Sequence, residues 1–210
     1  MLETPDQQVR LQIATLRNKA REIRDGIRQS ELRRSNKLLI QHLFSSRIFR
    51  KSRRIAFYYP VKNEAGSVDI IQQSLQRGKK CFLPVLNPAN HSMVFVRTHA
   101  RTVLKNNWYG IPEPTGFSSL PINRFDIVLL PLLAFDASGS RIGMGGGYYD
   151  RALEMVAGRQ YYRTPQLIGL AFDKQKCSTI QARPWDVPLD GVFTESGFKL
   201  FTNYTRYFTL

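Results

Sequence analysis

The sequence is poor in cysteine and in long apolar runs. Its 210 residues include two cysteines, Cys81 and Cys177, which lie far apart without a CxxC or Cys/His spacing. This pattern excludes a disulfide framework and a zinc site, and it fits two buried thiols in a reducing cytoplasm. No window approaches the roughly 18 apolar residues of a membrane span. Because the first ten residues lack the apolar core of a secretory signal, we expect a cytoplasmic protein without a membrane partner.

Negative charge is scarce as well. Against 31 Lys and Arg there are 16 Asp and Glu, which gives a formal net charge of +15. Residues 1–54 hold 14 of the basic side chains but only 5 of the acidic ones. A basic chain attracts nucleic acid, anionic membranes, or small phosphorylated or polycarboxylate substrates. Since surplus charge also serves solubility, the charge alone does not choose among these.

The length and composition predict a folded unit. A chain of 210 residues is about one domain long, and 42% hydrophobic residues exclude collagen-like, low-complexity and wholly disordered proteins. We predict a single domain over residues 1–210. It comprises a basic helical N-terminal region (1–54), an α/β core (55–200) and a loosely attached tail (201–210).

Apolar periodicity indicates the elements. Apolar residues recur at helical spacing over residues 9–44, where Asp25-Gly26 or Gln29-Ser30 could divide two helices, and residues 45–54 form a basic connection. Apolar strands then alternate with helices, which favours a three-layer αβα fold with a mainly parallel sheet. The strands are expected at 55–59, 80–86, 93–97, 126–135, 167–172 and 191–194, and the helices at 68–77 and about 148–156.

A glycine-rich segment, RIGMGGGYYD at residues 141–150, follows the most apolar strand. Its four glycines permit positive φ and close approach to a ligand, and backbone N–H groups before a helix attract anions. Arg141 suits bidentate phosphate contact, and Asp150 could hold Mg²⁺. The segment is neither a Walker A loop nor a dinucleotide GxGxxG motif. The alternative is a flexible turn with Asp150 as a helix cap.

The segment FDASGSRIGMGGGYYDR resembles the signature of the 5-formyltetrahydrofolate cyclo-ligase family, also called methenyltetrahydrofolate synthetases. The resemblance extends over most of the chain. It includes the basic N-terminal helix, the strand followed by Glu64, and the segments GKKCFLPVL, WYGIPEP and WDVP in the family's order. Several independent segments in the right order make the match specific.

The resemblance implies a three-layer α/β fold and an activity dependent on ATP and Mg²⁺. The reaction is conversion of 5-formyltetrahydrofolate, possibly polyglutamylated, to 5,10-methenyltetrahydrofolate with release of ADP and phosphate. Transfer of the γ-phosphoryl group to the formyl oxygen would give an iminium phosphate that N10 attacks. Phosphoryl transfer needs positioning and charge neutralisation rather than a protein nucleophile. We also expect a monomer.

The resemblance also assigns residues. It implies catalytic roles for Arg141 and Tyr148, and Mg²⁺ ligation by Asp150 and Asp186. It implies ATP binding by Arg21, Arg24, Arg141, Ile142, Gly143, Met144, Gly145, Gly146, Gly147, Tyr148 and Tyr149. It implies folate binding by Tyr59, Glu64, Trp108, Met144, Gly145, Gly146, Gly147 and Tyr148.

Some of these assignments have competitors. Arg17 is a rival of Arg21 and Arg24 for the nucleotide. Relatives often carry Arg or Lys where this chain has Met144 and Gly146, so positive charge there must come from other residues.

Three further residues have an alternative structural role. Glu64 could be a solvated loop acid, and Trp108 could pack at the rim of the site rather than stack on the substrate. Asp186 could cap a turn, in which case Asp190 is the nearest rival as a metal ligand.

Two other functions compete with the cyclo-ligase. A nucleic-acid-binding protein would explain the charge, but the N-terminal region has only Phe44 and Phe49 as aromatic residues and no recognisable binding module. A sugar-phosphate isomerase or CoA-transferase relative would share the sheet and the anion loop. It would require a catalytic Glu or Lys and neither ATP nor Mg²⁺, which the glycine-rich segment and Asp186 disfavour.

Overall fold

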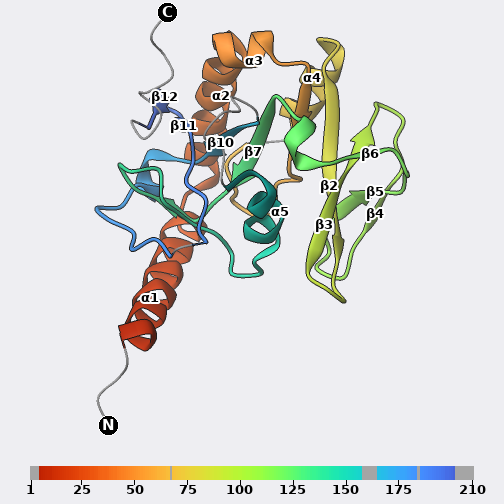
Figure 1. Ribbon diagram of the computed structural model, residues 1–210. Coiled ribbons are helices and arrows are strands. Elements are labelled where there is room, and N and C mark those ends of the chain that lie inside the picture. The colour runs from red at the N-terminus through yellow and green to blue at the C-terminus, as the bar shows by residue number, and fades with distance from the viewer. Residues whose placement is uncertain (1–4, 67, 158–164, 184, 202–210) are drawn as a thin grey trace, which may run out of the picture.

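A computed structural model describes residues 5–66, 68–157, 165–183 and 185–201. Its main feature is an eight-stranded sheet with the order β12-β11-β10-β7-β1-β2-β3-β6 (Figure 1). These strands are β1 (Arg54–Ala56), β2 (Lys80–Asn87), β3 (Ser92–Thr98), β6 (Ser119–Leu120), β7 (Ile127–Pro131), β10 (Gln166–Leu170), β11 (Gly191–Thr194) and β12 (Gly197–Leu200). Two small pairs lie outside the sheet, β4 (Leu104–Asn106) with β5 (Pro112–Pro114) and β8 (Ala134–Phe135) with β9 (Arg141–Ile142).

The centre of the sheet is parallel and its margins are antiparallel. Strands β11, β10, β7, β1 and β2 run parallel, whereas β12, β3 and β6 join by antiparallel pairing. The carboxyl ends of the parallel strands therefore meet at one edge, which is where α/β proteins place their ligands.

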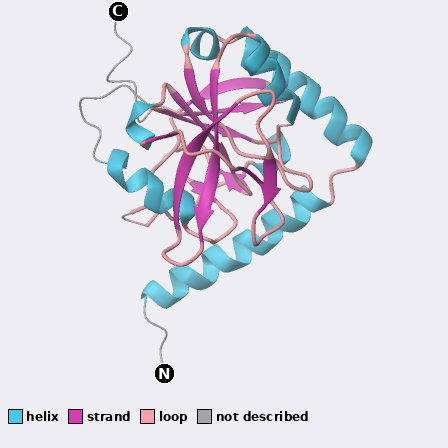
Figure 2. Ribbon diagram, turned by 90° about the vertical axis from the view of Figure 1, so that its right-hand side faces the viewer, coloured by secondary structure: helices cyan, strands magenta, loops and turns pink. Residues whose placement is uncertain are grey.

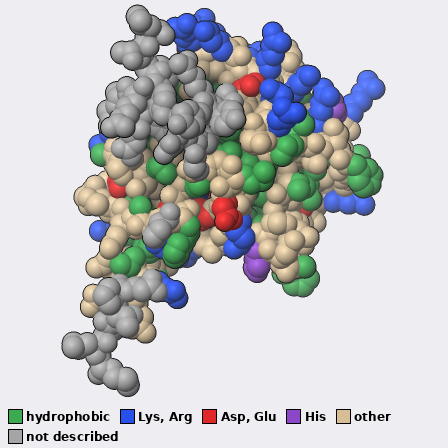
Figure 3. Space-filling view, in the orientation of Figure 1, with side chains coloured by type: hydrophobic (Ala, Val, Ile, Leu, Met, Phe, Trp, Pro, Cys, Tyr) green, Lys and Arg blue, Asp and Glu red, His purple; other side chains and the backbone are tan. Residues whose placement is uncertain are grey.

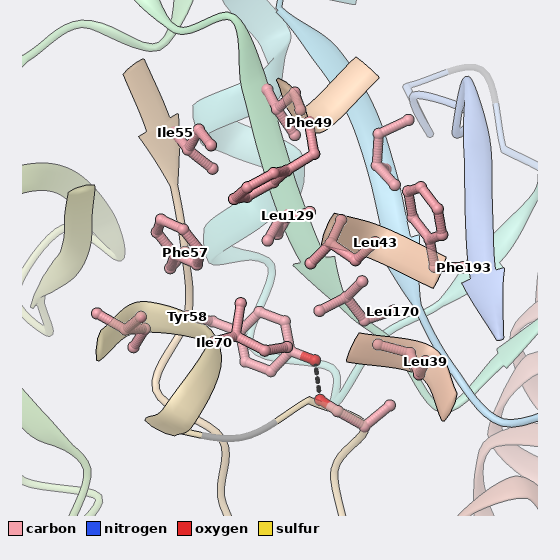
Figure 4. Close-up of a cluster of buried hydrophobic side chains, with 14 of the residues drawn as sticks. Leu39, Leu43, Phe49, Ile55, Phe57, Tyr58, Ile70, Leu129, Leu170 and Phe193 are labelled. Carbon is pink, nitrogen blue, oxygen red and sulfur yellow. Dashed lines mark hydrogen bonds between the residues drawn. The ribbon is translucent and has the colours of Figure 1, made fainter. Parts of the chain in front are cut away.

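Helices cover both faces of the sheet (Figure 2). One face packs against α2 (Gln29–Ser45), α3 (Arg47–Lys51) and α4 (Val68–Gln76), through residues such as Leu39, Leu43 and Phe49 (Figure 4). The other face packs against α5 (Tyr148–Ala157) through Leu153 and Val156. The fold is thus the expected α/β sandwich with a mainly parallel sheet.

The first helix, α1 (Pro5–Asp25), lies apart from these layers. Its apolar face packs on the β8–β9 pair, where Ile13 and Ala20 meet Leu133 and Ile142. Figure 2 shows α1 running across one end of the strands. The helix therefore lies at the edge of the sheet where β8, β9 and the glycine-rich segment that follows them are found. Among the described helices, none is both long and apolar enough to cross a membrane.

Most expected elements are present, with differences that have physical causes. The long N-terminal helix is divided between Asp25 and Gln29, as its sequence allowed. Residues 45–54 contain the helix α3, begun by the Ser46 side chain, which accepts a hydrogen bond from the Phe49 amide. The first strand ends at Ala56 rather than residue 59.

The expectation of a loose tail is wrong at its first residue. Phe201 is 1% exposed and packs against Phe135, and its amide donates to the Asp190 carbonyl. An aromatic ring buried in the core holds the chain there. The rest of the predicted tail, residues 202–210, lies outside the described residues.

Candidate active site

A cavity of about 880 Å³ opens at the carboxyl edge of the sheet. Its size is at the upper end of the range for small-molecule sites. The ends of β1, β2 and β7 form its floor, α1 forms one wall, and the glycine-rich loop with the start of α5 forms another. The lining includes most of the residues assigned from sequence, namely Arg24, Tyr59, Glu64, Arg141, Ile142, Gly143, Met144, Gly145, Gly146, Gly147, Tyr148, Tyr149, Asp150 and Asp186.

The glycine-rich loop needs glycine at two of its four positions. Gly145 has φ +103° and Gly147 has φ +68°, whereas the other two glycines avoid the left-handed region. Two loop carbonyls accept from arginines: Arg17 Nε donates to Gly143 at 3.1 Å, and Arg151 Nη2 donates to Gly146 at 2.7 Å. Within the described chain, the amides of residues 144–147 donate to no protein acceptor. These amides are available for an anion.

Arg141 stands at the base of this loop. Its side chain is 6% exposed, and Nη2 donates to Asp150 Oδ1 at 2.6 Å. Its Nη1 donates to the Val187 carbonyl, which ties the loop to the segment that carries Asp186. Burial lowers the pKa of Arg141, and the charges of Asp150 and Asp186 oppose that effect. The guanidinium is thus a fixed cation between two carboxylates.

The two carboxylates assigned to a metal lie on the same cavity. Asp150 is 33% exposed, and Asp186 is 20% exposed and paired with Arg183 Nη2 at 3.1 Å. Two carboxylates with space for phosphate oxygens and water are a donor set that suits Mg²⁺. Among the described residues no group of three or more metal-binding side chains forms a closed site. The rival Asp190 lies outside the cavity lining, where its Oδ2 accepts from the Leu167 amide.

Glu64 is buried in the lining of the same cavity. It is 7% exposed; its Oε2 accepts from the Val61 amide at 3.1 Å, and its Oε1 is 3.5 Å from Arg24 Nη1. Burial raises the pKa of Glu64, while the Val61 amide and the Arg24 charge act against that rise. The glutamate is therefore not a solvated loop acid.

Two tyrosines follow the loop, and both line the cavity. The Tyr148 hydroxyl lies 3.2 Å from that of Tyr109, and this hydrogen bond raises the pKa of Tyr148. The Tyr149 hydroxyl is buried without a partner in the described chain, and burial raises its pKa. An unpaired buried hydroxyl facing a cavity is available to a ligand.

The N-terminal basic residues occupy different places. Arg17 contacts the glycine-rich loop, Arg24 contacts Glu64, and Arg21 donates to Asn18 at 3.4 Å. Trp108 is 88% exposed and lies outside the cavity lining, although its neighbour Tyr109 belongs to it.

The sequence reasoning missed several residues of the lining, among them two before Asp186 and two in the β4–β5 hairpin. Arg183 and Trp185 both precede Asp186 in the chain, and Trp185 belongs to the WDVP segment, which could have indicated it. Tyr109 and Glu113 belong to the β4–β5 hairpin, whose position depends on the antiparallel extension of the sheet. Both belong to the WYGIPEP segment of the resemblance, which was used only to assign Trp108.

The chain matches known proteins over nearly its whole length. The model of the 5-formyltetrahydrofolate cyclo-ligase family matches residues 6–195. A 5-formyltetrahydrofolate cyclo-ligase of Haemophilus influenzae is 33% identical over 177 residues, which cover 83% of this chain and 92% of that protein. The protein of the same name from Escherichia coli K12 is 37% identical over 145 residues, or 68% and 78% of the two chains.

Solved structures agree with these matches. The NMR structure of Aquifex aeolicus 5,10-methenyltetrahydrofolate synthetase superimposes with a TM-score of 0.77 at 27% identity, covering 90% of this chain and 93% of that one. A 5,10-methenyltetrahydrofolate synthetase from Mycoplasma pneumoniae gives a TM-score of 0.67 at 26% identity, covering 87% and 98%.

Proposed function

The chain belongs to the 5-formyltetrahydrofolate cyclo-ligase family and is an enzyme of that family, and on this premise we propose that it converts 5-formyltetrahydrofolate to 5,10-methenyltetrahydrofolate with consumption of ATP. The observation that carries the proposal is the single cavity shared by the glycine-rich loop and Glu64. One wall offers free amides to a phosphate chain, and the other offers a buried carboxylate to a ring with N–H donors.

The reaction requires activation of a poor leaving group. Transfer of the γ-phosphoryl group to the formyl oxygen would form an iminium phosphate and release ADP. Attack by N10 on the formyl carbon then closes the ring, and phosphate and the N10 proton leave. No protein nucleophile is needed, because each bond forms between atoms of the two substrates. The protein's task is to orient them and to stabilise the charge on the phosphoryl oxygens.

Residues of the loop wall serve the phosphates. The amides of residues 144–147 and the guanidinium of Arg141 would contact the phosphate oxygens. Arg17 is better placed than Arg21 or Arg24 to supply the N-terminal positive charge, because it already touches the loop. Asp150 and Asp186 would hold Mg²⁺, which would neutralise charge on the transferring group.

Residues around Glu64 serve the folate. Glu64 would accept two hydrogen bonds from the amidine-like edge of the pterin, with Tyr59 beside it. Tyr148, held by Tyr109 on the side facing the loop, would contact both substrates where the formyl group meets the γ-phosphate. Met144, the loop residue whose sulfur contacts Arg24, would touch the folate as well.

The test follows absorbance at the methenyl-tetrahydrofolate band. Purified protein is mixed with 5-formyltetrahydrofolate, ATP and Mg²⁺, and each component is omitted in turn. We expect the band to rise only when all three are present, with one ADP formed per product. Absence of the band from protein that circular dichroism shows to be folded would contradict the proposal.

A further inference from the structure

Arg24 is the most deeply buried charged side chain near the site. It is 1% exposed, and it belongs to α1, whereas the carboxylate that it contacts follows β1 forty positions later in the chain. An arginine so deeply buried is rarely found without a compensating partner. Its partners here are Glu64, the neighbouring Asp25 at 3.2 Å, and the sulfur of Met144 at 3.7 Å.

The partners of Arg24 place it on the part of the cavity lining around Glu64, the Glu64 wall (Arg24, Glu64 and Tyr149). Its Nη1 lies 3.5 Å from Glu64 Oε1, while its Nε and Nη2 both donate to Asp25. No contact joins it to Arg141 or to a backbone group of the glycine-rich loop, and its one contact there is the Met144 side chain. The sequence-based assignment of Arg24 to the nucleotide thus has a structural competitor.

We infer that Arg24 is a positioning residue for the folate: it holds the buried Glu64 side chain ionised and oriented toward the cavity, and it does not bind the nucleotide. This inference rests on the proposed function. The ionised form is the one that accepts two hydrogen bonds from a pterin, because a protonated carboxyl must donate with one of its oxygens. Without a nearby cation, a carboxylate at this depth would take up a proton instead.

The groups around Glu64 support this role for Arg24. The charge of Glu64 acts on two buried tyrosine hydroxyls and raises the pKa of each. These are Tyr58, which follows β1, and Tyr149 in α5. Tyr58 already donates to the Ala65 carbonyl, and both tyrosines are neutral at physiological pH because burial raises their pKa. The Val61 amide supplies one neutral donor. Arg24 is therefore the one cation that acts on Glu64 among the described residues.

The test compares Arg24→Gln and Arg24→Lys with Arg33→Gln, which removes one exposed positive charge from α2, away from the cavity lining. Binding of 5-formyltetrahydrofolate without ATP is measured by calorimetry, and KM for ATP by the absorbance assay. For Arg24→Gln we expect the folate Kd to rise about 10- to 100-fold, the range for loss of a hydrogen bond to a charged group. The ATP KM should change by less than about twofold.

The pH profile separates positioning from a purely structural role. Folate binding by the wild type should weaken as pH falls through the pKa of Glu64. In Arg24→Gln this limb should move to higher pH, because a favourable charge has been removed. Arg24→Lys should restore part of the shift, and Arg33→Gln should match the wild type. In the background Glu64→Gln, adding Arg24→Gln should weaken folate binding little further.

The outcomes distinguish this inference from the proposed function. If the wild type forms no methenyl product, the proposed function fails. If the wild type is active and Arg24→Gln raises the ATP KM while leaving the folate Kd and its pH profile unchanged, the inference fails and Arg24 belongs to the nucleotide. An unshifted profile in folded Arg24→Gln protein would also overturn it.

Discussion

The two walls of the cavity are built in opposite ways. In the Glu64 wall (Arg24, Glu64 and Tyr149) the charged side chains are buried, with exposed fractions of 1% for Arg24 and 7% for Glu64. The loop wall (Arg141, Asp150 and Asp186) keeps its cation buried but leaves its carboxylates 33% and 20% exposed. One wall has fixed polar groups, and the other has carboxylates that solvent and ions can reach.

This difference fits the two ligands that we propose, a folate and a nucleotide with its cation. A flat ring with directional N–H donors is selected by fixed acceptors, because a mismatched ligand leaves buried groups unpaired. A phosphate chain arriving with a cation needs carboxylates that can exchange their partners. Both carboxylates of the loop wall are paired with arginines, Asp150 with Arg141 and Asp186 with Arg183. We therefore expect substitutions in the loop wall to affect turnover and those in the Glu64 wall to affect folate affinity.

The largest effect should come from Arg141. Arg141→Ala should lower kcat by about 10²- to 10³-fold, as loss of a fixed group that stabilises transition-state charge does. Because Arg141 also anchors Asp150 and the Val187 carbonyl, circular dichroism must establish that the variant is folded. Arg141→Lys keeps the charge but loses the bidentate geometry, so its kcat should remain well below the wild type. Wild-type kcat in either variant would remove Arg141 from the chemistry.

Glu64 tests the other wall. Glu64→Gln should raise the Kd for 5-formyltetrahydrofolate about 10- to 100-fold and leave the ATP KM nearly unchanged. In the wild type, kcat/KM for folate should fall as pH drops through the pKa of Glu64. That limb should lie above the ordinary glutamate range because burial raises the pKa. In Glu64→Gln the limb should disappear. An equal effect on both substrates would show that the two walls do not act separately.

Asp186 measures how far the loop wall depends on a cation. Asp186→Asn should raise the Mg²⁺ concentration for half-maximal activity on the order of tenfold, because cation affinity follows the number of charged ligands. Asp69→Asn, an exposed carboxylate at the start of α4, is the matched control and should leave the Mg²⁺ titration unchanged. If Asp186→Asn behaves like this control, Asp186 serves only to hold Arg183.

Two glycines of the loop, one with positive φ and one without, test how much the loop depends on its backbone conformation. Gly145→Ala places a side chain at φ +103° and should cost about 1–2 kcal/mol of unfolding free energy in urea titrations. Its ATP KM should rise, because the loop amides move with the backbone. Gly143 has open space around its Cβ position and no positive φ. Gly143→Ala should stay within about 0.5 kcal/mol of the wild type. Equal stabilities would mean that the loop relaxes freely.

Trp108 should give the smallest effect. Its ring is 88% exposed outside the cavity lining, so Trp108→Ala should change the folate KM by less than about threefold. A tenfold rise would show that the β4–β5 hairpin moves onto the bound substrate, and Trp108 would then join the Glu64 wall. Quenching of tryptophan fluorescence on folate addition gives an independent readout, with Trp108→Phe as its control.

The centre of the sheet could be predicted because its strands are apolar and buried. Residues 126–135 and 167–172 were expected as strands; the first range divides into β7 and the separately paired β8, and β10 overlaps the second. The end of β1 was less predictable. Phe57 to Tyr59 continue the apolar pattern but leave the sheet, and Tyr58 and Tyr59 reach the cavity. A buried wall and a buried strand give the same hydrophobic pattern.

Tertiary contacts between distant residues were beyond the sequence. The Lys79 Nζ donates to the carbonyls of Phe49, Arg50 and Ser52 and so satisfies the last turn of α3, a contact between segments about 30 residues apart. The sequence does not indicate that Arg24 contacts Glu64, because helical spacing identifies the apolar face of a helix but not the residues that pack against it. The resemblance supplied the candidate residues, and the fold supplied the contacts between them.

The clustering of basic residues is likewise clearer in three dimensions. Lys and Arg side chains gather along one edge of the molecule, over the region of α3 and α4 (Figure 3). Arg54 and Lys80 begin neighbouring parallel strands there, at the amino edge of the sheet. The cavity lies at the carboxyl edge. Much of the positive charge therefore lies away from the cavity.

The burial of Phe201 has a consequence for the order in which the protein is made. Its ring lies against the position that a Cβ on Gly139 would occupy, within the turn that precedes the glycine-rich loop, and the Leu189 amide donates to the Gly139 carbonyl. The turn at Gly139 is therefore synthesised well before Phe201, the residue that packs against it. Residue 201 must emerge from the ribosome before this turn gains its packing partner. The nascent chain can form β1, β2 and β7 before residue 201 emerges, but the turn before the glycine-rich loop gains this support only afterwards.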